Sequence, residues 1–225
     1  MPALISELID KVDNVELVRD QIAAILKVEL EKQNELGAFP PAGKPQPRVF
    51  AERSNPWGEF IEAERDQAPI INVWFDSASY GESTSNVVER QKAEAVYNID
   101  CYGSGVSVDD GNTVGGHVPA DLQAALEAQR AARLARNILM AGHYTYLGLR
   151  GLVWKRFPQT LSMFQPQLEN RAAQRVVGAR LALQVHFNEF SPQVIGVALE
   201  ALTVEIYRAG TGELYLRADY PPQEE

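Results

Sequence analysis

Apolar residues recur every three or four positions between Leu4 and Leu36, which is the spacing of one face of an amphipathic helix. Asp13 interrupts this stripe with a residue type that caps helices, and Gly37 is a residue type that ends them. We therefore predict a helical segment over residues 1–38 that packs on the domain following it.

The next part of the chain changes from a helical to an alternating pattern. Four prolines within residues 39–47 are incompatible with a continued helix and predict an extended connector. Beyond it, apolar and polar residues alternate with the period of half-buried strands. The alternating runs cover residues 71–76, 93–101, 181–188, 202–207 and 214–217, and residues 48–53 are a short strand candidate. A short Gly-rich link joins the last two runs and predicts a C-terminal β-hairpin, and residues 77–86 are predicted to form an exposed polar loop.

A second helix is predicted over residues 119–142. Pro119 suits the start of a helix, and the high alanine content allows close packing against a sheet. Leu122 and Leu126 belong to the predicted buried side. Arg130 and Arg133 fall on the side that we expect to face solvent or a partner.

These elements define the predicted fold class. Residues 143–170 contain apolar runs broken by glycine and bracketed by Pro158 and Pro166, and the pattern predicts no defined element there. Because no βαβ rhythm appears, the class is α+β: a largely antiparallel or mixed sheet covered by two long helices, with an extended arm and the C-terminal hairpin. We predict a single α+β domain over residues 48–220 and a frayed acidic tail over residues 221–225.

Two apolar side chains fall on the polar sides of their strands, Trp74 and Val96. Large apolar residues on both faces indicate that the sheet is covered twice. The helices cover one face, and either long loops of the chain itself or another subunit covers the other.

The distribution of charge adds an asymmetry. The chain of 225 residues has 21 Lys and Arg against 30 Asp and Glu, a net charge of −9. Residues 119–180 carry 9 basic and 3 acidic side chains, residues 1–118 carry 10 and 20, and residues 199–225 carry 2 and 6. Such an acidic protein is a poor general binder of nucleic acid, since phosphate contacts need clustered Lys and Arg. The alternation of charge fits pairing within a subunit, pairing between copies, or ordinary surface variation.

The sequence offers little chemistry. A single cysteine and three histidines argue against a disulfide framework, a multi-cysteine zinc site and a His-rich metal cage, so we expect no cofactor and no metal. The Gly-rich stretch 103–118 lacks the residues of phosphate and dinucleotide loops, which favours a flexible surface loop. Within it, Asp109 and Asp110 lack the ligand spacing of a calcium loop and fit an Asx turn. With no long apolar run and no secretory signal, we expect a soluble protein of a reducing compartment.

Only one residue pair has the composition of a catalytic site. His186 and Glu189 are close in sequence, and a His–carboxylate pair can orient a general base. In a strand, however, positions three apart point to opposite faces unless a bulge intervenes, which favours an exposed strand histidine. Cys101 lies on the apolar side of its strand and is predicted to be a buried, inert thiol.

The order of the elements resembles the tail terminator (tail completion) proteins of long-tailed bacteriophages. The strands 71–76 and 95–103, the Ala-rich helix 119–142 and the strand ending at 186–192 carry this resemblance, which covers residues 48–210. It implies a small α+β domain without catalytic residues that assembles as a hexameric ring. Such a ring caps the completed tail tube, stops its polymerisation and presents a surface to the head connector.

The resemblance also implies partners and a location. The partners are further copies of the chain, the tail tube protein and the head–tail connector protein, at the head-proximal end of the virion tail after assembly in the host cytoplasm. DNA passes through the lumen without specific binding, and no membrane is involved. Alternatives are another phage connector, neck or baseplate protein, or a small hydrolase that uses His186 and Glu189.

A ring of identical subunits needs two different patches that complement one another. The connector 39–47 and the hairpin 199–217 suit contacts with a neighbour, since exposed strand edges can pair across subunits. The residues that we expect at subunit or tube contacts are Trp74, Asp109, Asp110, Arg130, Arg133, Trp154, Arg156, Glu205 and Arg217.

Overall fold

The structure, a computed structural model, describes residues 10, 12–39, 44–58, 60, 68–82, 90–105, 108–109, 117–166, 176–190, 202–207 and 214–220. The chain separates into two units, Met1–Ser191 and Pro192–Glu225. The second unit contains β8 (Leu202–Tyr207) and β9 (Leu214–Tyr220), which form an antiparallel pair. The sequence predicts that they belong to one domain with the main sheet. This stays a prediction; within the described part of the chain, β8 and β9 pair with each other and form a two-stranded sheet of their own.

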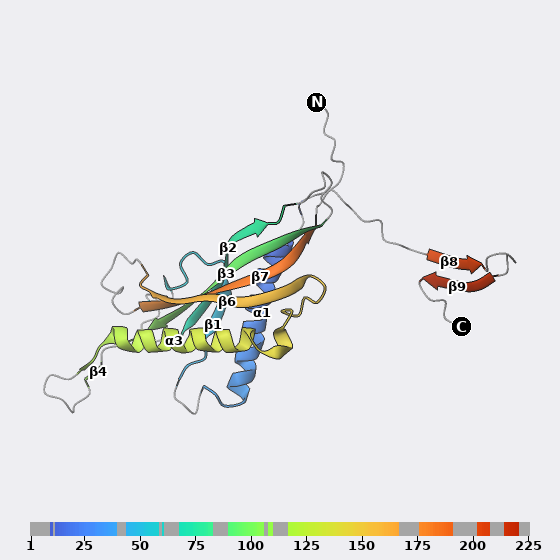
Figure 1. The fold of residues 1–225 in the computed structure, drawn as a ribbon. Helices are drawn as coiled ribbons and strands as arrows, with labels where there is room; N and C mark the ends of the chain where they lie inside the picture. The colour runs from blue at the N-terminus through green and yellow to red at the C-terminus, as the bar shows by residue number, and fades with distance from the viewer. Residues whose placement is uncertain are drawn as a thin grey trace. The chain divides into compact units, whose positions relative to one another are not determined.

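The first unit is built on a five-stranded sheet (Figure 1). Its strands are β1 (Arg48–Ala51), β2 (Ile70–Tyr80), β3 (Arg90–Ser104), β6 (Val153–Phe164) and β7 (Val176–Phe190). Their order is β1-β2-β3-β7-β6, with β1 parallel to β2 and the other neighbours antiparallel. The sheet is therefore mixed, and the protein has the predicted α+β fold.

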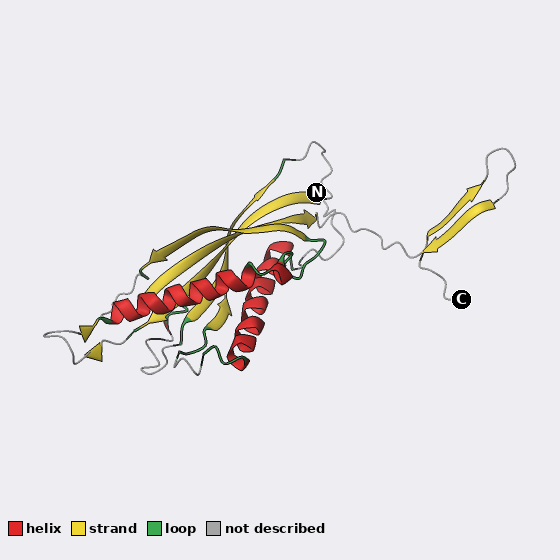
Figure 2. Cartoon of the chain, turned by 60° about the horizontal axis from the view of Figure 1, so that its bottom comes forward, coloured by secondary structure: helices red, strands yellow, loops and turns green. Residues whose placement is uncertain are grey.

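Two helices, α1 (Asn14–Glu35) and α3 (Ala120–Leu139), lie on the same face of this sheet (Figure 2). α1 begins with a capping box, in which the Asp13 carboxylate accepts from the Glu16 amide and the Glu16 carboxylate accepts from the Asp13 amide. The chain leaves α1 through Gly37, whose φ of 81° favours glycine. Most of the predicted helix before Asp13 lies outside the described residues.

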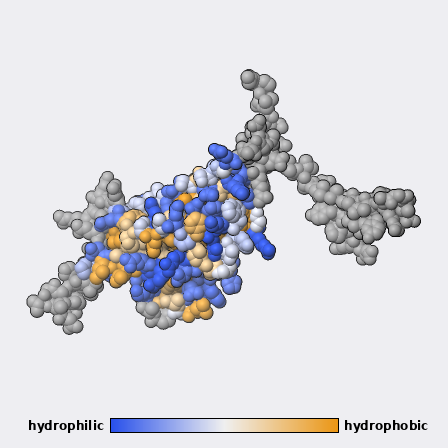
Figure 3. Space-filling model, in the orientation of Figure 1, coloured by the Kyte–Doolittle hydropathy of each residue, from blue (hydrophilic) through white to orange (hydrophobic). Residues whose placement is uncertain are grey.

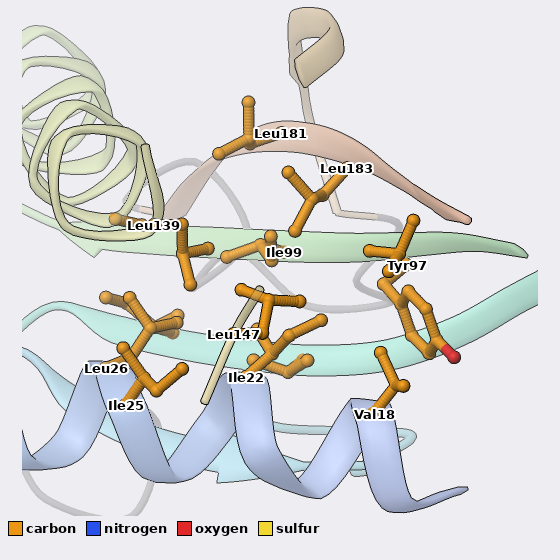
Figure 4. Close-up of a cluster of buried hydrophobic side chains, with 14 of the residues drawn as sticks. Val18, Ile22, Ile25, Leu26, Tyr97, Ile99, Leu139, Leu147, Leu181 and Leu183 are labelled. Carbon is orange, nitrogen blue, oxygen red and sulfur yellow. The ribbon is translucent and has the colours of Figure 1, made fainter. Parts of the chain in front are cut away.

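The core lies between the helices and the sheet (Figure 4). Val18, Ile22 and Leu26 of α1 point toward the sheet and are fully buried. They meet apolar side chains of β3 and β7 such as Ile99 and Leu183. Each of these aliphatic side chains contributes roughly 2 kcal/mol by leaving water.

The buried side of α3 differs from the predicted one. Alanines and one leucine fill it, whereas Leu122 and Leu126 are 50% and 55% exposed. The reason is the close approach of α3 to Gly103 and Gly105, where an added Cβ would overlap the helix backbone. Only small side chains fit such a gap, so larger ones lie outside it.

The same contact corrects part of the predicted surface loop over residues 103–118. Gly103 lies within β3, and both Gly103 and Gly105 are buried against α3. Two short strands follow, β4 (Val108–Asp109) and β5 (His117–Val118), which pair with each other. The middle of the predicted loop lies outside the described residues.

The stretch without a predicted element contains a short 3-10 helix, η2 (Gly142–Tyr144), and then β6. Pro158 is tolerated within β6 because this strand lies at the edge of the sheet and its register shifts next to the proline. Where a loop over 77–86 is predicted, β2 instead continues to Tyr80 beyond a register shift after Phe75.

The Pro-rich connector packs on its own subunit rather than extending away from it. Phe39 is buried, and Lys44 Nζ lies 3.0 Å from Glu127 Oε1 on α3. The Pro45 carbonyl accepts a hydrogen bond of 2.8 Å from Arg130. Residues 40–43 lie outside the described part.

Candidate functional site

The sheet face opposite the helices, called the open face below, carries an unusual row of polar side chains. Alternate residues of β2, β3 and β7 point to it, because their strand neighbours point into the core. Several of these polar residues are buried: Asn72, Asn98, Asp100, His186 and Asn188. Buried polar groups usually have hydrogen-bond partners, and those of Asn72, Asn98 and Asp100 organise the surface, whereas neither ring nitrogen of His186 has a hydrogen-bond partner among the described residues.

Asp100 is the centre of the best-defined cluster. Arg180 donates to both of its carboxylate oxygens, from Nε at 2.7 Å and from Nη2 at 2.8 Å. Trp74 Nε1 donates to the same carboxylate at 2.9 Å, and the Tyr102 hydroxyl does so at 3.3 Å. This bidentate geometry fixes the direction of the guanidinium.

Aromatic rings hold Arg180 from the sides. Its guanidinium carbon lies 4.9 Å from the centroid of the Trp74 ring and 5.1 Å from that of Phe164. The hydrogen bonds to Asp100 raise the pKa of Arg180, while its side chain stays 36% exposed. A hollow of about 310 Å³ opens beside this cluster. A charged, partly exposed group held in one orientation suits contact with another macromolecule, because little conformational entropy is lost on binding.

The chain itself covers one end of the open face. Trp57, which follows β1, packs on Tyr102 with ring centroids 5.3 Å apart. The Asn72 side chain donates to the Arg53 carbonyl and accepts from its amide. Trp74 and Val96 are half-buried, so the cover expected from their sequence positions is partial.

At the other end, His186 is buried among aromatic rings and is not the exposed histidine that was predicted. The Trp154 and Phe157 ring centroids lie 4.9 Å and 5.7 Å from that of His186. Its nearest carboxylate is Glu94, with Nδ1 and Oε1 3.4 Å apart. Glu189 points to the other face, where the Asn14 amide of α1 donates to it at 3.2 Å. The His186–Glu189 pair of the hydrolase hypothesis is therefore not assembled.

A second surface combines α3 with the edge strand. We call it the α3–β6 surface and define it by Leu122, Leu126, Arg133 and Arg136 of α3 and Leu161 and Met163 of β6. The four apolar members are between 44% and 55% exposed. A hollow of about 370 Å³ lies between the two elements and is lined by both arginines, Leu161 and Met163. Figure 3 shows apolar residues gathered over the end of α3 and the neighbouring edge of the sheet.

Several residues expected at contacts occupy these two surfaces and others do not. Trp74 and Trp154 lie on the open face, and Arg133 lies on the α3–β6 surface. Asp109 belongs to β4, and Glu205 of β8 pairs with Arg217 of β9 in the strand register. Asp110 lies outside the described residues.

Arg130 is not a surface residue. It is 8% exposed, and its Nε donates to Glu127 Oε2 at 2.8 Å. Together with its bond to the Pro45 carbonyl, this pairing fastens the connector to α3. The helical period placed Arg130 on the outer side because the sequence does not reveal that the connector covers it.

Arg156 also acts within the subunit. Its guanidinium donates to the carbonyls of Leu139, Ala141 and Thr145, at 2.7, 2.8 and 3.3 Å. Leu139 is the last residue of α3, where the helix leaves acceptors without intrahelical partners, and Ala141 and Thr145 flank η2.

We predict that Arg156→Met destabilises the first unit by about 2 kcal/mol, because the Leu139 and Thr145 carbonyls lose this donor while the apolar stem is kept; the Ala141 carbonyl still accepts from the Tyr144 amide. Urea unfolding followed by circular dichroism measures this loss. Lys155→Met serves as the control, since Lys155 is exposed and its ammonium contacts only the Phe157 ring face among the interactions described here. Equal unfolding midpoints for the two variants would contradict the capping role.

The sequence did not identify Asp100, Arg180, Leu161 or Met163 as surface-forming residues. Arg180 directly precedes an alternating apolar run, which only weakly indicates a surface role. Its pairing with Asp100 depends on the strand register, which joins residues 80 positions apart in the chain. Leu161 and Met163 alternate with polar residues as in a strand, but Pro158 argues against predicting a strand there.

The described residues show no arrangement typical of metal chemistry, since no group of three or more His, Cys, Asp and Glu side chains is placed to hold an ion. Burial raises the pKa of the Cys101 thiol, which disfavours the reactive thiolate. The described helices are also too short or too polar to cross a lipid bilayer. Comparison of the sequence with protein-family models and with curated proteins finds no match.

Proposed function

We propose that this protein is a virion structural protein of a long-tailed bacteriophage, a tail terminator that forms a homohexameric ring at the head-proximal end of the tail. The ring caps the tail tube and provides the surface for the head–tail connector. The observation that carries the proposal is the presence of two chemically different surfaces on one subunit, the open face and the α3–β6 surface. A cyclic assembly uses two such unlike patches on every copy.

The character of the surfaces supports binding rather than catalysis. Asp100 and Arg180 satisfy each other, and the guanidinium contacts the Trp74 and Phe164 rings. The exposed apolar side chains of the α3–β6 surface are of the kind that protein interfaces cover. A net charge of −9 suits a ring through which DNA passes without binding.

Mass photometry of the purified full-length protein tests the ring, with an expected species at six times the subunit mass of 24.9 kDa. Electron microscopy of the protein mixed with purified tail tubes tests the function, with rings expected at one tube end. A strict monomer at all concentrations that also leaves tubes bare would refute the proposal. Rings found at the connector, the neck or the baseplate of the virion would favour the alternative assembly roles.

A further inference from the structure

We propose that the β8–β9 hairpin of one subunit docks on the α3–β6 surface of a second copy and adds a strand to the free edge of β6. This inference rests on the proposed ring and names the contact that joins its subunits. Four observations carry it: the exposed edge of β6, the small size of the hairpin sheet, the complementary charges, and the length of chain before the hairpin.

The edge of β6 is open to pairing. Among the described strands, β6 is the outermost of the sheet and pairs with β7 on one side alone. Residues 159–163 are all exposed, with Leu161 at 54% and Met163 at 44%. An exposed apolar edge strand is a template for a strand from another chain. Pro158 has no amide hydrogen to donate and interrupts the edge at its middle, which leaves residues 159–164 as the uninterrupted pairing segment beyond it.

The hairpin needs a surface to pack on. Its two strands have 6 and 7 residues and form a two-stranded sheet of their own. Such an isolated pair is only marginally stable in water, and a third strand or a packed face makes it stable. Its sequence supplies alternating apolar residues for that face, among them Leu202, Val204 and Ile206.

The hairpin segment and the α3–β6 surface carry opposite charges. Residues 192–225 carry 6 acidic and 2 basic side chains. Arg133 and Arg136 line the hollow between α3 and β6. This complementarity steers an acidic hairpin to the α3–β6 surface and disfavours pairing of two such surfaces with each other.

The length of chain before the hairpin favours a second copy as the donor. Leu161 pairs with Leu181, and Leu181 lies nine residues before Phe190, where β7 ends. The pairing segment of β6 is therefore roughly 30 Å along the sheet from the end of β7. The 11 residues between Phe190 and Leu202 span at most about 40 Å when fully extended. The hairpin of the same chain would need that linker extended to about three-quarters of its full length, whereas the hairpin of a neighbour has no such limit.

The full-length variant Leu161→Glu tests the acceptor surface. It places a carboxylate where the acidic hairpin docks, and because the side chain is exposed the fold should persist. We expect assembly to weaken by about tenfold or more in mass photometry. The control Val28→Glu changes an equally exposed apolar residue of α1, 60% exposed, and should assemble normally. Circular dichroism verifies that both variants are folded.

A donor variant completes the test. Ile206→Glu combined with Leu216→Glu places two carboxylates on directly opposed residues of the hairpin and should disrupt it. Neither this variant nor Leu161→Glu should assemble alone, but an equal mixture should form dimers, since one intact donor then meets one intact acceptor.

The outcomes separate the two proposals. Normal rings from either variant, or a mixture that stays monomeric, would overturn the hairpin contact while rings of the unmodified protein uphold the proposed function. A strictly monomeric unmodified protein would overturn both. If such a monomer protects the amides of residues 159–163 from hydrogen exchange and Leu161→Glu removes that protection, the hairpin docks within its own chain and the contact between copies is wrong.

Discussion

Gly103→Ala is expected to destabilise the first unit by about 3 kcal/mol, at the upper end of the usual cost of overpacking. A Cβ at this position would lie 2.7 Å from the amide nitrogen of Ala128 and would also overlap the carbonyl of Ala124. Both atoms belong to the backbone of α3, which cannot turn aside as a side chain can. The helix must therefore move away from β3, and the alanines packed around this contact lose part of their burial.

Gly178→Ala is the matched control, because it adds the same methyl group to another buried strand glycine. Its Cβ would lie 2.7 Å from Cε1 of Phe164, which is part of a side chain near the end of an edge strand. The ring tip can swing away with its side chain, at the cost of part of its contact with Arg180 and Tyr102, so we expect a smaller loss than at Gly103, about 1 kcal/mol. Urea unfolding of both variants measures the difference. Similar losses at the two glycines would show that α3 is not seated closely enough to restrict position 103.

Asp100→Ala should cost about 3 kcal/mol, the lower end for breaking a buried ion pair. The change leaves the Arg180 guanidinium, the Trp74 indole and the Tyr102 hydroxyl without their shared acceptor. The lower end applies because Arg180 is 36% exposed, so water can solvate part of the charge that Asp100 releases.

Two further variants test this explanation. Asp76→Ala removes an exposed carboxylate that accepts hydrogen bonds from Asn98 and Ser77, and it should cost about 1 kcal/mol, well below Asp100→Ala. Asp100→Leu with Arg180→Met should recover much of the lost stability, since no unpaired charge remains. Unfolding midpoints provide the measurement, together with the fluorescence of Trp74. A double variant as unstable as Asp100→Ala alone would contradict the ion-pair argument.

Periodicity predicted much of the first unit because its elements have one buried side. The stripe from Val15 to Leu30 gives α1, and Ile99 and Leu183 lie on the inner sides of their predicted strands. The capping residue Asp13 and the terminating Gly37 were identified from residue type alone.

The features that the sequence pattern did not predict depend on contacts between distant segments of the chain. Gly103 was assigned to a loop because its role is to admit the backbone of α3, which no local pattern reveals. Arg130 was assigned to the surface because the connector that covers it lies 85 residues earlier in the chain. The Asp100–Arg180 cluster, which anchors the open face, needed the β3–β7 register as well as the sequence.

The position of β7 also affects how the protein folds during synthesis. This strand lies between β3 and β6, and its pairing with β3 joins Ser104 to Val176 and Arg90 to Phe190. At roughly 5–20 residues per second, the ribosome needs on the order of ten seconds to proceed from the end of β3 to the end of β7. During that interval β3 lacks its β7 neighbour, and β6 also lacks it once β6 has been synthesised. These strands are where chaperones should bind, and insertion of β7 should be the slow step of folding.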